Sequence, residues 1–101
     1  MSFSTLALRA EIVTALTKLG YHEPTEVQSQ VIPMALEGKN IIVQSHTGSG
    51  KTAAFVIPAL NRIDPRLRKP QVLILEPTRE LAMQTREEVM NISRDMRMGS
   101  L

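Results

Sequence analysis

A glycine-rich stretch between an apolar run and a helical pattern constrains this chain more than any other feature. The stretch is Ser45-His46-Thr47-Gly48-Ser49-Gly50-Lys51-Thr52, and it follows Ile41-Ile42-Val43 and precedes apolar residues at helical spacing. That context places it where a buried strand turns into a helix. Glycines allow successive N–H groups to converge on an anion, and the helix N-terminus adds partial positive charge. We therefore expect a phosphate-binding loop.

The last two residues of this loop have the chemistry of nucleotide binding. Lys51 is expected to contact the β and γ phosphates, and the Thr52 hydroxyl is expected to ligate Mg²⁺. The usual pattern begins with glycine, where this chain has Ser45. A plain glycine-rich turn is the alternative interpretation. The strand before the loop and the helix after it favour nucleotide binding.

Composition sets the limits of the fold. The chain has 101 residues, enough for one small domain. Nucleotide-binding α/β domains usually need about five strands or more, and only two are convincing here, so we expect the front part of a larger domain. The chain has no cysteine, no apolar run that could cross a membrane and no signal pattern, which favours a soluble, cytoplasmic protein without a membrane partner. A net charge of +2 does not diagnose nucleic-acid binding.

Two helices are predicted before the loop. Ile12, Leu16 and Leu19 recur at helical spacing, and Gly20 is expected to end that helix. A second helix is expected from about residue 26 to residue 36, capped by Thr25 and followed by Gly38. Thr25 and Gln28 also have the spacing of a capping box, which gives Gln28 a purely structural interpretation.

Two further helices and a second strand are predicted after the loop. We expect a helix over about 51–63, then a surface loop in which a basic cluster (Arg62, Arg66, Arg68 and Lys69) is solvated, and then a buried strand, Val72-Leu73-Ile74-Leu75. Thr78 is expected to cap a last helix whose inner stripe is Leu81, Thr85, Val89, Ile92 and Met96, with Glu87 and Glu88 facing solvent. Strand, helix and strand in this order imply a right-handed parallel crossover in an α/β fold.

Glu76 ends the second apolar run and has two interpretations. An acid in that position resembles the carboxylate that coordinates Mg²⁺ in P-loop enzymes. Because Pro77 follows at once, we interpret Glu76 as a strand-end residue, with a metal role as the alternative.

Three ordered stretches resemble the start of a DEAD-box ATP-dependent RNA helicase. The segment 20–28 resembles the Q motif, with Phe3 upstream where the family has an isolated aromatic residue; 45–52 resembles motif I, and 77–84 matches motif Ia. The resemblance implies a partial RecA-like P-loop NTPase domain, a parallel sheet between two layers of helices that is incomplete in this chain. It divides the chain into a Q-motif helical region (1–38), a P-loop strand and helix (39–63) and a motif Ia strand and helix (71–98).

The resemblance also implies roles for the matching residues. Gln28 would read the adenine edge with its amide donor and acceptor, Tyr21 would stack on the ring, and Phe3 would pack behind the pocket. The phosphates of ATP would be held by Ser45, His46, Thr47, Gly48, Ser49, Gly50, Lys51 and Thr52, with Thr52 on Mg²⁺. The capping box remains the alternative role for Gln28.

Motif Ia implies a second binding surface. Pro77, Thr78, Arg79 and Glu80 would hold the RNA backbone, since a hydroxyl, a planar cation and a helix N-terminus all suit phosphate and read no sequence. The alternative is a helix cap beside a solvated charge. DNA in place of RNA stays open, because the contacts are to the backbone.

The chain also departs from the family pattern. It has no Asp-Glu-Ala-Asp motif, no Ser-Ala-Thr motif and no second RecA-like domain, so we predict that it alone does not hydrolyse ATP or unwind RNA. The family's sheet has further strands between the two found here, so these two would lack partners in this chain. Two other functions stay open: a truncated nucleotide or RNA-binding module without turnover, and a small-molecule P-loop kinase.

Overall fold

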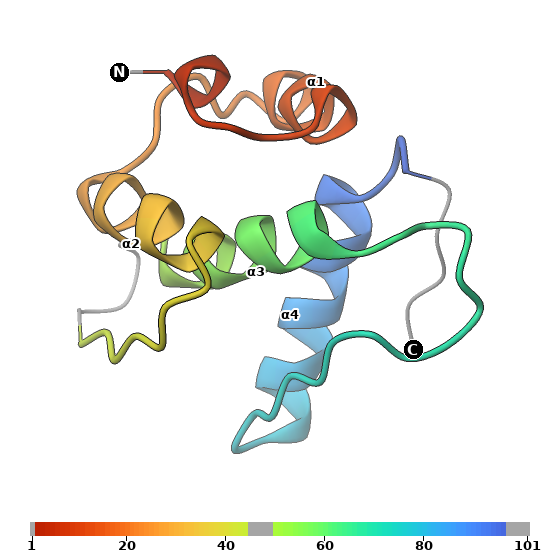
Figure 1. Ribbon diagram of the computed structural model, residues 1–101. Coiled ribbons are helices and arrows are strands. Elements are labelled where there is room, and N and C mark those ends of the chain that lie inside the picture. The colour runs from red at the N-terminus through yellow and green to blue at the C-terminus, as the bar shows by residue number, and fades with distance from the viewer. Residues whose placement is uncertain (1, 45–49, 97–101) are drawn as a thin grey trace.

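The computed structural model describes residues 2–44 and 50–96. These residues form a short 3-10 helix, η1 (Phe3–Thr5), and four α-helices: α1 (Ala10–Lys18), α2 (Glu26–Leu36), α3 (Lys51–Arg62) and α4 (Arg79–Ile92). Helix α3 lies at the centre and packs against each of the other three, with α1 above it in Figure 1 and α4 crossing it. None of the helices within the described ranges is long and apolar enough to cross a membrane.

The helix ends follow local sequence signals. Gly20 and Gly38, just beyond α1 and α2, have φ angles of +84° and +82°, the left-handed conformation that ends many helices. Thr25 and Thr78 cap α2 and α4 with their side chains. All four predicted helices are therefore confirmed, and most of their ends lie within one or two residues of the predicted positions.

The core is formed by one apolar face of each helix. The side chains of Ile12 and Leu16 from α1, Ile32 from α2, Ile57 from α3 and Ile92 from α4 are fully buried. Burial of each such side chain contributes about 1.5–3 kcal/mol. Along α4 the predicted inner stripe is confirmed for Thr85 and Ile92, which are buried, and in part for Val89, which is half-buried. Leu81 is exposed, and Met96 is buried but lies beyond the end of α4 at Ile92, so the helix is shorter than predicted.

The two predicted strands do not form a sheet in the described part of the chain. Residues 41–44 and 71–76 have no regular secondary structure, and Ile42, Leu73 and Leu75 are 95%, 82% and 83% exposed. The prediction that Val72–Leu75 is buried on both faces is wrong for this chain, because Leu73 and Leu75 are largely exposed and only Ile74 and Val72 are partly covered. A strand needs a hydrogen-bonding neighbour, and even two paired strands are marginal alone. The parallel crossover is likewise not confirmed.

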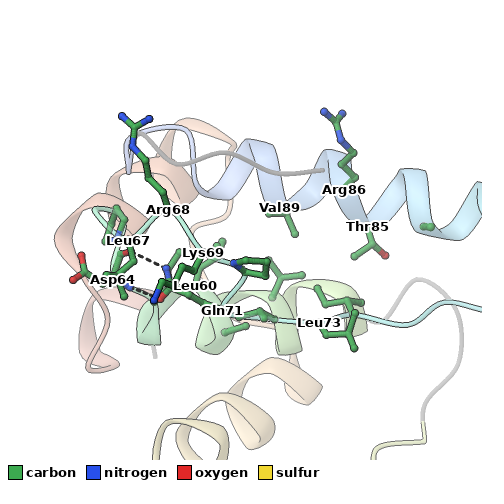
Figure 2. A pocket seen from close by; sticks show the side chains of 18 of the residues that line it. Leu60, Asp64, Leu67, Arg68, Lys69, Gln71, Leu73, Thr85, Arg86 and Val89 are labelled. Carbon is green, nitrogen blue, oxygen red and sulfur yellow. Dashed lines mark hydrogen bonds between the residues drawn. The ribbon is translucent and has the colours of Figure 1, made fainter.

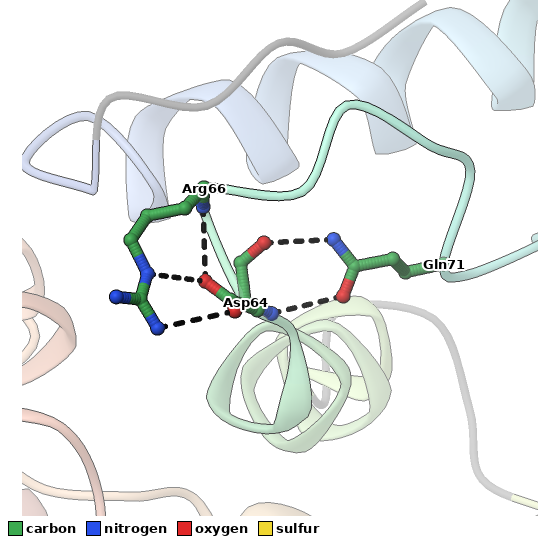
Figure 3. Close-up of polar contacts among 3 residues, drawn as sticks. All are labelled: Asp64, Arg66 and Gln71. Atoms are coloured by element: carbon green, nitrogen blue, oxygen red, sulfur yellow. Dashed lines mark hydrogen bonds and ion pairs between the residues drawn. The ribbon is translucent and has the colours of Figure 1, made fainter.

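A side-chain clamp closes the loop after α3 (Figure 3). The Asp64 N–H donates to Gln71 Oε1 at 2.9 Å, and Gln71 Nε2 donates back to the Asp64 carbonyl at 2.8 Å. Arg66 pairs with the Asp64 carboxylate at 3.2 Å, and its hydrogen bonds hold the pKa of Asp64 below the ordinary value. Arg66, Arg68 and Lys69 are exposed, as the prediction of a solvated loop requires.

Candidate functional site

The start of α2 meets the start of α3 through the side chain of Gln28. Gln28 Oε1 accepts from the Thr25 N–H at 2.9 Å, and Thr25 Oγ1 accepts from the Gln28 N–H at 3.3 Å, so the predicted capping box is confirmed. In addition, Gln28 Nε2 donates to the Gly50 carbonyl at 3.2 Å. Gln28 is 5% exposed. One buried amide therefore caps its own helix and joins it to the end of the glycine-rich loop.

Gly50 tolerates this contact because it has no side chain. Its φ is +85°, and a Cβ at this position would lie 2.5 Å from Gln28 Nε2 and 3.0 Å from Thr25 Oγ1. Its carbonyl also accepts from the Ala54 N–H at 3.1 Å, the first hydrogen bond of α3. Both the backbone angle and the close approach thus require glycine.

The N-terminus of α3 supports binding of an anion. Lys51 and Thr52 are its first two residues, and the unpaired N–H groups of a first turn carry partial positive charge. Of the predicted phosphate loop, Ser45, His46, Thr47, Gly48 and Ser49 lie outside the described residues, and their contacts stay a prediction.

The described residues could hold Mg²⁺ only together with a bound phosphate group. They contain no group of three His, Cys, Asp or Glu side chains that could hold a metal ion. Thr52, the second residue of α3, is half-buried, and its hydroxyl oxygen is the predicted ligand. That suits Mg²⁺, which keeps several waters and binds largely through substrate phosphates.

The two aromatic candidates lie in different surroundings. Phe3 is buried in the core with residues of α1, α2 and α3, so it anchors the N-terminal segment, and its place behind an adenine pocket stays a prediction. Tyr21 is 37% exposed, and its hydroxyl donates to Glu88 Oε1 on α4 at 3.2 Å. Partial burial, the charge of Glu88 and this hydrogen bond raise the pKa of Tyr21 above its ordinary value.

The contact between Tyr21 and Glu88 corrects one prediction from the sequence. Glu88 is expected to face solvent, whereas it is half-buried and bonded. The two residues are 67 positions apart, and no pattern in one sequence connects positions at that separation. Only the packing of α1 against α4 brings them together.

The second group of candidates forms an exposed turn at the start of α4. Thr78 Oγ1 accepts from the Leu81 N–H at 3.1 Å, which confirms the predicted cap. Pro77, Thr78, Arg79 and Glu80 are all exposed. The free N–H groups of the first turn of α4 therefore lie beside a cationic side chain on the surface.

Glu76, just before this turn, has a protein partner. Its Oε1 accepts from the Thr85 hydroxyl at 2.6 Å, and Thr85 is 6% exposed. The carboxylate thus has a hydrogen-bond partner within the chain. Because residues 71–76 form no strand here, both interpretations of Glu76 stay predictions.

A cavity of about 880 Å³ separates α3 and α4 from the segment after the clamp (Figure 2). Its walls include Leu60 of α3, Val89 of α4 and the exposed Leu73. Neither Gln28 nor Gly50 lines it, so it is separate from the candidate nucleotide site. It lies where the apolar residues of 71–75 stand away from the helices without pairing.

Comparison with known proteins agrees with this arrangement. The chain is 51% identical over 96 residues to the ATP-dependent RNA helicase DeaD of Klebsiella pneumoniae, covering 95% of this chain and 15% of that protein. It is 52% identical over 92 residues to the ATP-dependent RNA helicase DbpA of Bacillus subtilis, covering 91% of this chain and 19% of the relative. The chain thus spans less than a fifth of the length of either relative.

Solved structures give the same result. Dbp5 of S. cerevisiae bound to RNA and ADP BeF3 superposes with a TM-score of 0.91 at 36% identity, over 95% of this chain and 25% of that one. A DEAD box protein from the hyperthermophile Methanococcus jannaschii superposes with a TM-score of 0.84 at 36% identity, over 100% of this chain and 27% of that one. The sequence model of the DEAD/DEAH box helicase family matches residues 25–100. Because that match covers most of the chain, the chain belongs to the DEAD/DEAH box helicase family and fits the N-terminal part of a DEAD-box helicase.

Proposed function

We propose that this chain supplies the ATP-binding and RNA-backbone-binding part of an ATP-dependent RNA helicase that unwinds or remodels RNA in the cytoplasm. The names of the relatives support the activity, and the RNA and ADP BeF3 bound to Dbp5 support the two ligands. In the complete domain, residues 41–43 and 72–75 are strands of a RecA-like parallel sheet, with the four helices on its faces.

The link between Gln28 and Gly50 carries the nucleotide half of the proposal. A side-chain amide offers one donor face and one acceptor face, which match the adenine edge and mismatch guanine. The structure already holds this amide against the residue that precedes α3, so adenine recognition and phosphate binding share one rigid unit. Tyr21 stacks on the base, Ser45–Lys51 hold the phosphates, and Thr52 ligates Mg²⁺.

The exposed turn at 77–80 carries the RNA half. The first turn of α4 offers backbone N–H groups, Thr78 a hydroxyl oxygen and Arg79 a planar cation, and all of these face solvent. Groups of this kind bind phosphate and fix the register of the protein on the strand without reading bases.

Turnover needs residues that this sequence does not contain. Phosphoryl transfer depends on groups that position water and stabilise charge on the transferred phosphate. The aspartates of the chain are Asp64, which is engaged by Arg66, and Asp95, which pairs with Lys18 at 3.5 Å. Neither lies at the candidate nucleotide site, so the chain by itself binds ATP without hydrolysing it.

The substitution Gln28→Glu tests adenine recognition against capping. Glutamate keeps the oxygen that accepts from the Thr25 N–H, so α2 stays capped, but it loses the donor to Gly50 and adds a charge. We expect the preference for ADP over GDP to be lost, with affinity for ADP falling about tenfold or more, because the variant no longer offers both a donor and an acceptor to adenine. The melting temperature should fall as well, because the new carboxylate is buried against the Gly50 carbonyl. Calorimetric titration with ADP and GDP measures this.

Gln30→Glu is the matched control for that experiment. Gln30 is exposed on the same helix, so its substitution adds the same negative charge to α2 at a distance from the buried Gln28 amide. It should leave affinity for ADP and the preference over GDP unchanged. Equal losses of affinity for ADP and for GDP in Gln28→Glu, in step with the loss of thermal stability, would assign Gln28 to the cap alone and contradict adenine recognition.

A further inference from the structure

The turn that carries Pro77–Glu80 is held at both of its ends by side chains. At its far end, Thr78 accepts from the Leu81 N–H at 3.1 Å. At its near end, Glu76 accepts from the hydroxyl of Thr85 at 2.6 Å. The exposed turn therefore lies inside a closed loop whose two ends meet on one side of α4.

The contact between Glu76 and Thr85 is strong for its type. A hydroxyl that donates to a carboxylate at this distance makes a charge-assisted hydrogen bond. Thr85 is 6% exposed, so its hydroxyl would have little access to water if the bond were lost. In Figure 2 the side chain of Thr85 projects from α4 toward the segment that carries Lys69, Gln71 and Leu73, whereas Arg86 points away.

Little else fixes the near end of the turn. Residues 71–75 have no regular secondary structure in the described part of the chain, and Leu73 and Leu75 are almost fully exposed. In the described part of the chain, no ladder of hydrogen bonds orders the backbone between Gln71 and the turn. The bond to Thr85 is the side-chain contact that ties this backbone to the helix whose N-terminus faces the proposed phosphate.

We propose that Glu76 and Thr85 are a positioning pair for RNA binding. They do not touch RNA. They hold Thr78, Arg79 and the first N–H groups of α4 in one fixed arrangement. The turn is therefore already ordered in the free protein, and RNA binding loses less conformational entropy. The pair also turns the Glu76 carboxylate toward α4, away from the phosphate that it would repel. This inference rests on the proposed RNA-backbone site.

Thr85→Val tests the pair in the 101-residue chain, where residues 71–75 form no strand. Valine has the shape of threonine without the hydroxyl, so it removes the hydrogen bond and leaves the packing. We expect affinity for a labelled single-stranded oligouridine, measured by fluorescence anisotropy, to fall roughly fivefold. Affinity for ADP should stay within about twofold of the unmodified protein. Thr85→Ser keeps the hydroxyl and should restore RNA affinity.

Two controls separate positioning from general damage. Thr17→Val makes the same substitution on α1, where the hydroxyl bonds only to the Val13 carbonyl of its own helix, and it should leave RNA affinity unchanged. Glu76→Leu removes the other partner of the hydrogen bond, and Glu87→Gln is its control because it removes an exposed charge from α4 close to Thr85. Glu87→Gln should change RNA affinity less than Glu76→Leu does.

The outcomes distinguish this inference from the proposed function. If Arg79→Ala weakens RNA binding and Thr85→Val does not, the positioning pair is overturned while the RNA site stands. If Arg79→Ala has no effect either, the RNA site itself is overturned and the pair with it. Equal losses of RNA affinity, ADP affinity and melting temperature in Thr85→Val, without rescue by Thr85→Ser, would make the contact merely structural and overturn the pair.

Discussion

At the scale of single residues, Gly50 combines more constraints than any other described position. Its backbone is left-handed, its carbonyl starts α3, and its missing side chain admits the Gln28 amide. Sequence reasoning finds Gly50 as part of a phosphate loop. It cannot find the contact with Gln28, because the two residues are 22 positions apart and meet only when α2 packs on α3.

Gly50→Ala should damage both stability and nucleotide binding. The left-handed φ alone costs about 1–2 kcal/mol in an alanine, and the collision with Gln28 Nε2 adds to that cost. Gly20→Ala is the matched control, because Gly20 has φ +84° and a Cβ there would meet nothing within 4 Å. Chemical denaturation should show a larger loss for Gly50→Ala than for Gly20→Ala, and ADP affinity should fall only in the former. Equal losses in both proteins would mean that the approach of Gln28 is unimportant.

At the scale of elements, the helices could be predicted and the strands could not be confirmed. Caps such as Thr25 and Thr78 and the terminal Gly38 act within a few residues, so the sequence beside each helix is enough to place its ends. A strand depends on a partner elsewhere. Val72–Leu75 has the composition of a buried strand, but no strand pairs with it among the described residues, and Leu73 and Leu75 are largely exposed. The partner of Glu76 escapes sequence reasoning for the same reason, since Thr85 is fixed by the packing of α4.

Helix α4 also carries a prediction of its own. Arg79→Ala should weaken RNA binding to a similar degree for oligouridine and oligoadenosine, because a phosphate contact reads no base. The slope of log affinity against log salt should flatten by about 1, as expected for one lost phosphate contact. Arg94→Ala, an exposed arginine just beyond the end of the same helix, is the control and should leave the slope unchanged. A loss that depends strongly on base sequence would contradict backbone binding.

At the scale of the whole molecule, the described helices form a core around α3 without a sheet. The core contains at least one fully buried aliphatic side chain from each α-helix, and Asn61 of α3 holds the N-terminal segment by accepting from the Arg9 N–H at 2.7 Å. A core of this kind gives each helix a defined environment, even though the segments 41–44 and 71–76 are largely exposed. We therefore expect the chain to keep the start of α3 beside Gln28 without the rest of a helicase.

The 101-residue chain should bind Mg·ADP and show no turnover of ATP. In a ¹H–¹⁵N correlation spectrum we expect dispersed peaks, with those of Tyr21, Gln28 and Gly50–Thr52 shifting on addition of Mg·ADP and not of Mg·GDP. Phosphate release from ATP should equal the buffer blank with or without RNA, since the groups that activate water are not in this sequence. Collapsed peaks that ignore both nucleotides would show that the site needs the longer domain. RNA-stimulated ATPase activity in a preparation free of other helicases would contradict the second expectation.

The exposed run Val72–Leu75 has a consequence for solubility. Four consecutive apolar residues outside any helix or strand, with Leu73 and Leu75 largely exposed, are a template for intermolecular β-aggregation. A charged residue followed closely by a proline stands on each side of the run, Lys69-Pro70 before it and Glu76-Pro77 after it. Such flanking residues act as gatekeepers, because a charge repels stacked copies and a proline lacks the N–H that would extend the ladder. We therefore expect the residues on either side of 72–75 to limit self-association of the chain while this segment is unpaired.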